Sequence, residues 1–327
     1  MTDPLVVVTD SDLPESCADL ELLRAAGLHA RRERCASGAD VMAVARDADA
    51  LIVQWAPIDA DVLDALDRCR FISRLGIGYD MIDVEAATRR GIAVANTPDY
   101  CVEEVAAHTV ALILAGARGL FALDRAVRDG RWSATADAPH AVRPSLATVA
   151  VVGFGRIGSL TARHCAALGF RVVVHDPHVP GDAIVAAGHT AVSLDHALNT
   201  ADIITLHAPL TARTRHLIGG ATLAQMRPGA LLVNTCRGGL VDEAALAAAL
   251  REEHLGGAAL DVFHTEPLPA DSPLRTAPNV VLTPHAAWYS RASLAELPLR
   301  AAQQVVDFLA GRPVPSIVNP EYRKEQA

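Results

Sequence analysis

The chain has 327 residues, of which 51% are apolar and 4% aromatic, and its formal charge at pH 7 is −9. This length accommodates two domains with substantial cores, and the acidic balance argues against a nucleic-acid partner. No apolar run is long enough to cross a bilayer, which argues against a membrane partner. The six cysteines form no C-x-x-C pair and no metal-ligand spacing with histidine. Together with the missing signal peptide, this predicts reduced thiols, no metal site and a cytoplasmic protein.

Apolar strands and helices alternate through the first hundred residues. We expect strands over 5–9, 50–54, 70–75 and 92–95, and helices over 14–26, 39–47, 59–67 and 83–90. Such alternation is typical of a parallel sheet with helices on both faces. This first unit carries no glycine motif for binding phosphate, so we interpret it as a substrate domain.

A polar break over 96–100 separates this unit from a long helical segment. The helix is expected over 102–116 and, with interruptions, toward Asp129, and turn residues predict a loop over 130–146. Beyond the loop we expect strands over 148–152, 171–175, 202–206, 230–234, 257–260 and 280–282, and helices over 221–227 and 242–251. These elements predict a second parallel α/β unit.

The first strand of the second unit leads into a predicted dinucleotide site. The motif G-x-G-x-x-G is formed by Gly153, Gly155 and Gly158. The first glycine permits a tight turn, the second lets the backbone approach a pyrophosphate, and the third lets the helix pack closely on the strand. Helix amides from Arg156 onward would point at the phosphates. Asp176, 18 residues beyond the last glycine, would accept hydrogen bonds from the adenosine ribose and repel a 2′-phosphate, which favours NAD(H) over NADP(H).

The last helical stretch, 290–310, carries Pro298 in its interior. Because proline removes an intrahelical hydrogen bond and disfavours helix at the preceding residue, we expect a kink or a break there. The tail over 311–327 is polar and is expected either to pack on the first domain or to fray.

Three segments that follow predicted strands carry candidate catalytic side chains. Arg237 lies in a glycine-containing loop, where its guanidinium suits a carboxylate and a neighbouring carbonyl oxygen. From this residue alone, a surface ion pair is an equal alternative. Asp261 ends one strand, Glu266 follows it in a loop, and His285 follows another strand. Histidine exchanges protons near neutral pH, and a neighbouring carboxylate favours its charged form. An arginine, a glutamate and a histidine facing one cofactor fit hydride transfer to a 2-oxo acid.

Several motifs occur together along the chain. They are RLGIGYDMID at 74–83, VEEVAAHT at 102–109, GFGRIG at 153–158, HAPLTARTRHLI at 207–218, VNTCRGGLVDE at 233–243, DVFHTEP at 261–267 and TPHAAW at 283–288. In their order and spacing the chain resembles, over nearly its whole length, the D-isomer-specific 2-hydroxyacid dehydrogenases. In that comparison the segment at 74–83 is similar to the family's substrate-carboxylate loop, and the segment at 102–109 to its interdomain helix.

The resemblance implies a reversible, NAD(H)-linked interconversion of a 2-oxo acid and a D-2-hydroxy acid. His285 would donate a proton to the carbonyl oxygen, Glu266 would hold His285 oriented and protonated, and Arg237 would bind the carboxylate and the carbonyl. Backbone amides would hold the substrate carboxylate, at Gly76, Ile77 and Gly78. The implied cofactor contacts are Thr109, Gly153, Gly155, Arg156, Ile157, Gly158, Asp176, Ala208, Pro209, Thr214, Thr235, Cys236 and, on the nicotinamide carboxamide, Asp261.

HAAWYS at 285–290 and Arg74 are similar to the C-terminal-binding-protein branch of the family. That likeness implies that Arg74 and Trp288 border the substrate, although a packing aromatic is the alternative for Trp288. Members of that branch in animals act as NAD-sensing corepressors, but this chain lacks their long tail and differs over 130–146, so an enzyme is the better interpretation. A corepressor-like binding protein stays an alternative, as does a relative that uses phosphite or a phosphonate-bearing 2-oxo acid. Glu266 argues against formate, because formate-oxidising relatives carry glutamine there.

The resemblance also implies an α/β architecture of two doubly wound parallel-sheet domains with a cleft between them. The flavodoxin-like substrate domain would comprise 1–98 and 290–327, and the Rossmann NAD-binding domain 99–289. The helices after residue 101 resemble those through which family members form two-fold dimers, so we expect a homodimer. The 2-oxo acid itself is left open, because Arg74 suits either a second acidic group or the 2-oxo acid carboxylate.

Overall fold

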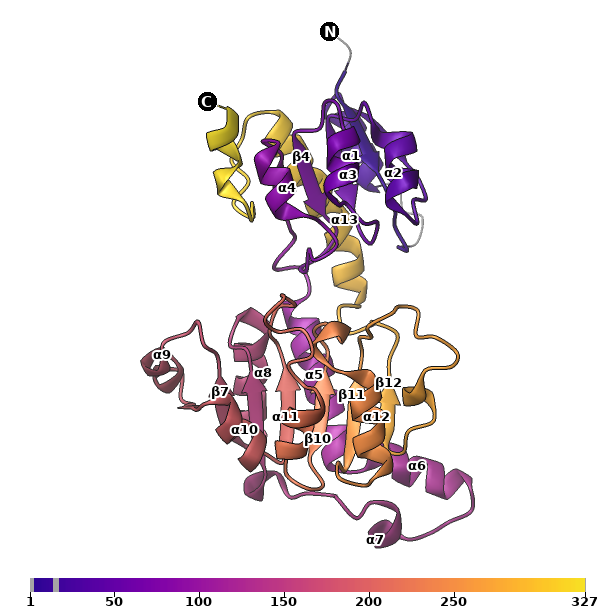
Figure 1. Ribbon diagram of the computed structural model, residues 1–327, viewed down its shortest axis with the longest axis vertical. Helices are drawn as coiled ribbons and strands as arrows, with labels where there is room; N and C mark the ends of the chain where they lie inside the picture. Colours follow the sequence, from indigo (N-terminus) through magenta and orange to yellow (C-terminus); the bar gives the residue numbers. More distant parts are fainter. Residues whose placement is uncertain (1–2, 14–17, 327) are drawn as a thin grey trace. The chain divides into compact units, whose positions relative to one another are not determined.

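The computed structural model describes residues 3–13 and 18–326. The chain forms two compact units, which are Met1–Cys101 with Ser290–Ala327, and Val102–Tyr289 (Figure 1). The sequence placed the corresponding boundaries after residues 98 and 289. The start of the first predicted helix, 14–17, lies outside the described residues. Each unit is built on its own parallel sheet.

The first unit contains a five-stranded parallel sheet with the order β2-β1-β3-β4-β5. Its strands are β1 (Leu5–Val8), β2 (His29–Arg32), β3 (Ala50–Val53), β4 (Phe71–Arg74) and β5 (Ala93–Ala95). Its helices are α1 (Ala18–Ala25), α2 (Gly38–Ala45), α3 (Ala60–Ala65), α4 (Val84–Arg89), α13 (Arg291–Leu309) and the 3-10 helix η4 (Pro320–Gln326). This strand order is that of flavodoxin-like doubly wound folds.

Helices cover both faces of this sheet. Neighbouring residues of a strand point to opposite faces, so Ile72 packs among residues of α2, α3 and α4, whereas Phe71 stacks on Phe308 of α13 with ring centroids 4.4 Å apart. The chain beyond α13 then follows β5, where the side chain of Asn319 accepts a hydrogen bond from the Val94 amide at 2.8 Å. The tail therefore packs on the first unit, which was one of the two outcomes expected for it.

The second unit contains a seven-stranded parallel sheet with the order β12-β11-β10-β9-β6-β7-β8. Its strands are β6 (Thr148–Val152), β7 (Arg171–His175), β8 (Thr190–Ala191), β9 (Ile203–Leu206), β10 (Leu231–Asn234), β11 (Gly257–Leu260) and β12 (Val280–Leu282). Its helices are α5 (Val102–Ala117), α6 (Leu120–Arg128), α7 (Ala134–Asp137), α8 (Arg156–Ala167), α9 (Gly181–Ala186), α10 (Leu194–Thr200), α11 (Gly220–Gln225) and α12 (Glu243–Arg251), with the 3-10 helices η1 (Pro144–Leu146), η2 (Gly238–Leu240) and η3 (Pro273–Arg275). The strand order reverses between β6 and β9, and ligands of such sheets bind beyond the carboxyl ends at this reversal.

This sheet also carries a core on each face. Along β6, Val149 and Val151 pack with residues of α5 and α8, whereas Ala150 and Val152 pack with residues of α10, α11 and α12. Because both faces are covered, the central strands β6, β9 and β10 are buried along their whole length. The predicted fold class, two doubly wound parallel-sheet α/β units, is confirmed.

Some local predictions were wrong. A break at Pro298, one of the two outcomes expected there, does not occur, because α13 continues through it; Pro298 is buried together with Leu297, so packing within the first unit outweighs the missing hydrogen bond. The segment 130–146 is not all loop, because Ser133 caps the short helix α7 by accepting from the Ala136 amide at 3.3 Å. The strands β2 and β8 and the helices α9 and α10 were not predicted.

Among the described residues no single helix is long and apolar enough to span a membrane, and α5 and α6 reach that length only as a pair bent by 60°. The described part of the chain holds no group of three or more histidine, cysteine, aspartate or glutamate residues placed to bind a metal. Cys35, Cys69 and Cys165 form no disulfide in the described part of the chain, and burial raises the pKa of Cys69 and of Cys165 to about 12. These two thiols are therefore protonated, and not nucleophilic, at neutral pH.

Candidate active site

The turn after β6 has the geometry that its three glycines predict. Gly153 has a φ of +100°, and a Cβ there would lie 2.6 Å from the main chain of His207. A Cβ at Gly158 would lie 2.1 Å from the carbonyl oxygen of Gly153, so only glycine lets α8 approach the strand this closely. Gly155, the N-cap of α8, faces open space. The arrangement leaves one helix N-terminus accessible to a diphosphate.

Asp176 follows β7 directly and lies against this turn. One carboxylate oxygen accepts from the Phe154 amide at 2.7 Å, and the other accepts from the His178 amide at 2.8 Å. The residue is partly exposed. The acid at the end of the second strand is therefore tied to the glycine turn, at the position where an adenosine ribose lies in sheets of this order.

The segment after β9 lies beside the glycine turn. A Cβ at Gly153 would come within 3 Å of main-chain atoms of both His207 and Ala208. The thiol of Cys236 lies 2.9 Å from the Ala208 carbonyl oxygen, and the Thr214 hydroxyl donates to the Pro209 carbonyl at 2.6 Å. Burial lowers the pKa of His207 to about 4, so its ring is neutral at pH 7.

Thr109 of α5 lies beneath the carboxyl end of β10. Its hydroxyl is fully buried, donates to the Val105 carbonyl at 2.7 Å and lies 2.7 Å from the Thr235 hydroxyl. Because the single hydroxyl hydrogen of Thr109 goes to Val105, Thr235 is the donor between the two hydroxyls. The hydrogen bond between the two hydroxyls therefore links α5 to the end of β10.

Arg237 lies on a loop whose conformation depends on the side chain of Asn234 and on Gly238. The side chain of Asn234, fully buried at the end of β10, accepts from the Cys236 amide at 3.0 Å and donates to the Arg237 carbonyl at 2.8 Å. A Cβ at Gly238 would lie 1.8 Å from the carbonyl carbon of Phe263. Glycine therefore lets the Arg237 loop press against the main chain of the loop that carries Glu266.

Glu266 and His285 form a hydrogen-bonded pair. Nδ1 of His285 lies 2.7 Å from Oε2 of Glu266, and Oε1 accepts from the Phe263 amide at 2.8 Å. Partial burial would raise the pKa of Glu266, but the hydrogen bond and charge of His285, the Phe263 amide and the charge of Arg237 together lower it below 4.5. Arg237, Glu266 and His285 are thus brought together at the carboxyl edge of the seven-stranded sheet.

Asp261, at the end of β11, is fully buried. Its carboxylate accepts hydrogen bonds from the Thr283 hydroxyl and from the amides of Ala286 and Ala287. Trp288 is partly buried on the loop that follows β12. Its ring is edge-on to that of Tyr289, with 5.8 Å between the ring centroids.

The remaining predicted site residues lie in the first unit, with Arg74 at the end of β4 and the others on the loop after it. The guanidinium of Arg74 is stacked 5.3 Å from the centre of the Trp55 ring, and one nitrogen would lie 1.4 Å from a Cβ at Gly76. Gly76 has a φ of +140°, so glycine is required both for the backbone and for the place of the guanidinium. The side chain of Asn96 donates to the Ile77 carbonyl at 2.7 Å and the Thr97 amide to the Gly76 carbonyl at 2.9 Å, which holds the loop at these two residues.

Sequence reasoning missed the supporting side chains Asn234, Thr283 and His108. Each makes hydrogen bonds that support a loop with a candidate catalytic residue, and the sequence motifs that contain them do not indicate this role. Their signal in the sequence is position, because Asn234 and Thr283 stand at the carboxyl ends of strands that precede Arg237 and His285. Asn234 is fully buried and Thr283 partly buried, and buried polar groups have to find partners.

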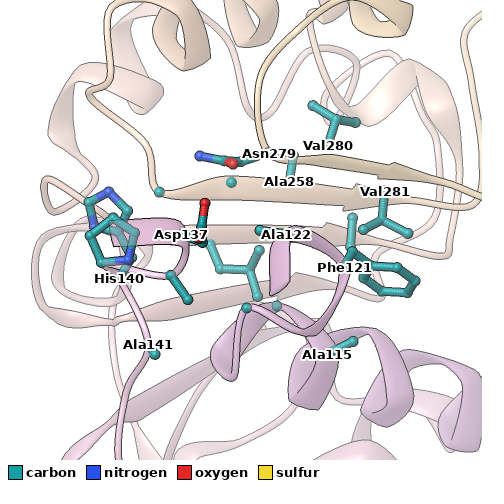
Figure 2. A pocket seen from close by; sticks show the side chains of 18 of the residues that line it. Ala115, Phe121, Ala122, Asp137, His140, Ala141, Ala258, Asn279, Val280 and Val281 are labelled. Carbon is teal, nitrogen blue, oxygen red and sulfur yellow. The ribbon is translucent and has the colours of Figure 1, made fainter. Parts of the chain in front are cut away.

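A largely apolar cavity of about 90 Å³ lies at the opposite, amino edge of the same sheet (Figure 2). Its walls come from α5, α6 and the segment around His140 on one side and from the beginnings of β11 and β12 on the other, including Phe121, Ala258 and Val281. Asp137 and His140 lie at its polar end. None of the predicted catalytic or cofactor residues lines it.

Comparison with known proteins agrees with this geometry. Residues 110–287, more than half of the chain, match the family model described as D-isomer specific 2-hydroxyacid dehydrogenase, NAD binding domain. The chain belongs to this family. The enzyme class and the cofactor that the sequence predicted, an NAD(H)-dependent oxidoreductase of 2-hydroxy acids, are confirmed. Its place in the C-terminal-binding-protein branch stays a prediction.

Relatives from several organisms cover most of the chain. A glyoxylate reductase from Korarchaeum cryptofilum is 39% identical over 288 residues, which are 85% of each chain. A D-3-phosphoglycerate dehydrogenase from Mycobacterium tuberculosis is 40% identical over 327 residues, which are 98% of this chain but 59% of that protein. Among solved structures, the D-lactate dehydrogenase of Aquifex aeolicus complexed with NAD and lactic acid has a TM-score of 0.84 and 28% identity, covering 94% of this chain and 96% of that one.

Proposed function

We propose that this protein reduces a small 2-oxo acid to the D-2-hydroxy acid with NADH, and catalyses the reverse oxidation with NAD. His285 is the general acid and base, Glu266 orients it, and Arg237 binds and polarises the substrate. The observation that carries the proposal is the 2.7 Å pair of His285 and Glu266 beside the charge of Arg237. The pair lies at the carboxyl edge of a sheet whose family model is an NAD-binding domain.

The hydrogen bond between the two side chains assigns the ring nitrogens. An ionised carboxylate only accepts hydrogen bonds, so Nδ1 of His285 carries the hydrogen that points to Glu266. Nε2 is then the nitrogen that gives a proton to the substrate carbonyl oxygen, or takes it from the hydroxyl in the reverse direction. A ring that carries hydrogen on both nitrogens is the proton donor needed for reduction.

Arg237 acts on the same oxygen. Its guanidinium stays charged at all relevant pH values and offers paired donors, which suit the substrate carboxylate and the carbonyl oxygen beside it. Negative charge that develops on that oxygen during reduction is stabilised before the proton arrives. The bound nicotinamide supplies the hydride.

The residues around the glycine turn fit this cofactor. Gly155 is open at the N-terminus of α8, and Asp176 lies against the turn with a carboxylate suited to ribose hydroxyls. We assign cofactor contacts to Gly153, Gly155, Arg156, Ile157, Gly158, Asp176, Ala208, Pro209, Thr214, Thr235 and Cys236. Thr109 supports the cofactor contact Thr235 through the hydrogen bond between their hydroxyls.

The loop of the first unit fits the substrate carboxylate. We assign this role to Gly76, Ile77 and Gly78, with Arg74 beside them and Trp288 as a further contact. Arg74 is 4% exposed, so its charge lies close to the loop and is little screened by water. The names of the relatives, glyoxylate reductase and D-3-phosphoglycerate dehydrogenase, favour small 2-oxo acids with or without a second acidic group.

Turnover tests the proposal directly. NADH oxidation is followed with glyoxylate, pyruvate, hydroxypyruvate and 3-phosphohydroxypyruvate, and at least one should be reduced to the D-hydroxy acid. His285→Gln should lower kcat by about 100-fold or more while NADH still binds, as measured by fluorescence. His196→Gln, on the exposed side of α10, is the matched control and should retain activity. The proposal fails if no 2-oxo acid is reduced or if His285→Gln turns over normally.

We also propose that two copies of the chain associate through the segment 120–146. Large apolar side chains are exposed along it, namely Leu120, Phe121, Val127, Trp132 and Leu146, and Trp132 is 88% exposed. Exposed apolar patches mark interaction surfaces, and a symmetric dimer is the commonest assembly. Light scattering should give twice the monomer mass, and Leu120→Glu should convert the protein to monomer, whereas Leu168→Glu, at an exposed residue directly after α8, should not.

A further inference from the structure

His285 has an uncommon backbone conformation. Its φ is +51°, in the left-handed region that residues other than glycine rarely adopt. Such a conformation persists only where the surroundings hold it. The side chain that the proposed reaction depends on is therefore aimed by its main chain, and what holds that main chain decides where the ring points.

One residue holds it from three positions. The main-chain carbonyl of Asp261 accepts from the His285 amide at 2.8 Å. The carboxylate of Asp261 accepts from the next two amides, with Oδ1 2.8 Å from the nitrogen of Ala286 and Oδ2 2.9 Å from that of Ala287. Three successive amides of the loop are thus bound by a single aspartate at the end of β11.

The carboxylate is in turn held by two side chains. The Thr283 hydroxyl donates to Oδ1 of Asp261 at 2.6 Å, a short distance typical of a bond to a charged acceptor. Since the hydroxyl hydrogen is used there, Thr283 accepts from His108 of α5, whose Nε2 lies 3.3 Å away. Nε2 of His108 also lies 3.7 Å from Oδ1. A chain of three side chains thus joins α5 to the His285 loop.

We propose that Asp261, held by Thr283 and His108, is a positioning residue for His285. This inference rests on the proposed function, in which His285 transfers the proton. Asp261 is 0% exposed and both of its oxygens already accept hydrogen bonds from the loop. A buried carboxylate of this kind fixes the geometry of the groups that surround it, because each of its donors is costly to lose. The alternative, a contact of Asp261 with the nicotinamide carboxamide, makes a different prediction for the same variants.

The test removes the hydroxyl of Thr283, because that group serves the carboxylate and bears no proposed contact with the reactants. Thr283→Val should lower kcat by about tenfold or more, as a displaced catalytic group does, with the Kd of NADH unchanged within about twofold. Thr283→Ser keeps the hydroxyl and should restore kcat. Thr161→Val is the matched control, because Thr161 is a buried threonine of the same unit whose hydroxyl has no hydrogen-bond partner among the described residues.

A second measurement does not depend on turnover. Amide hydrogen exchange at Ala286 and Ala287 should be faster in Thr283→Val than in wild type, with the amides of β6 unchanged. His108→Leu should give the same pattern with a smaller effect. If Thr283→Val weakens NADH binding at unchanged kcat, Asp261 serves the cofactor and the inference is wrong; unchanged exchange at both amides also overturns it. Absence of turnover by wild type with every 2-oxo acid would instead overturn the proposed function alone.

Discussion

Nδ1 of His285 and Oε2 of Glu266 lie 2.7 Å apart, while the other carboxylate oxygen accepts from the Phe263 amide. The carboxylate is therefore fixed within its own loop and holds the imidazole from a second loop. The pair joins the segment after β11 to the segment after β12, which are neighbours in the sheet.

The pKa of Glu266 predicts a pH dependence of stability. It is lowered from 4.5 in the folded protein, because the hydrogen bonds and positive charges beside it outweigh its burial. A carboxyl whose folded pKa is lowered stabilises the protein above its unfolded pKa, and this contribution is lost as the pH falls through the folded value. The difference in unfolding free energy between wild type and Glu266→Gln should therefore be largest near neutral pH and shrink below pH 4.5. Urea unfolding at about pH 7 and about pH 3.5 measures it, and a difference that stays constant would contradict the assignment.

Asp176 predicts the cofactor preference. Its carboxylate repels a 2′-phosphate and accepts from ribose hydroxyls, so Asp176→Ala should weaken the preference for NADH over NADPH. Loss of one hydrogen bond to a charged group corresponds to about tenfold or more in the ratio of the two kcat/KM values. The variant also loses the bond from the Phe154 amide, so both cofactors should bind less tightly than NADH does to wild type. An unchanged ratio would place the ribose elsewhere.

Gly238 predicts a steric requirement. A Cβ at this position would lie 1.8 Å from the main chain of Phe263, which has no flexible end to move away. Gly238→Ala should therefore separate the Arg237 loop from the Glu266 loop, lower stability by about 1–3 kcal/mol and reduce kcat. Gly220→Ala is the control, because a Cβ there meets nothing within 4 Å. Thermal unfolding and turnover of the two variants separate the outcomes.

A substitution at Thr161 should raise the stability of the protein. Its hydroxyl is buried on α8 and finds no hydrogen-bond partner within the part of the chain that the structure describes. Valine has nearly the same shape and no polar group to bury, so Thr161→Val should stabilise the protein by about 1 kcal/mol. A raised Tm with unchanged turnover is the expected result. A lowered Tm would show that the hydroxyl is satisfied in solution.

The sequence predicted the buried centre of both sheets better than their edges. The strand over Thr148–Val152 is apolar because helices cover both of its faces, and that run is visible without a structure. Three of the four residues of the edge strand β2, HARR, are polar, and β8 has only two residues, so neither gives an apolar signal. Local preference at Pro298 predicts a kink or a break, but burial within the first unit keeps α13 continuous there.

The candidate site was predictable where chemistry determines the residue type. A guanidinium, a carboxylate and an imidazole at the ends of strands stand out, and Arg237, Glu266 and His285 do lie together. The supports were not predictable, since Asn234 and Thr283 act through hydrogen bonds whose partners are known only once the loops are in place. Likewise, no sequence pattern predicts that His285 adopts a positive φ.

The return of α13 to the first unit imposes an order on biosynthesis. The seven-stranded unit is a continuous stretch, Val102–Tyr289, whereas the five-stranded unit needs both Met1–Cys101 and the segment from Ser290 onward. When a ribosome has made the first hundred residues, Phe71 has no Phe308 to stack on and β5 has no Asn319 beside it. These first hundred residues must therefore wait, with the part of their sheet that α13 covers still exposed, until nearly the whole polypeptide has emerged, and chaperone binding should concentrate on them.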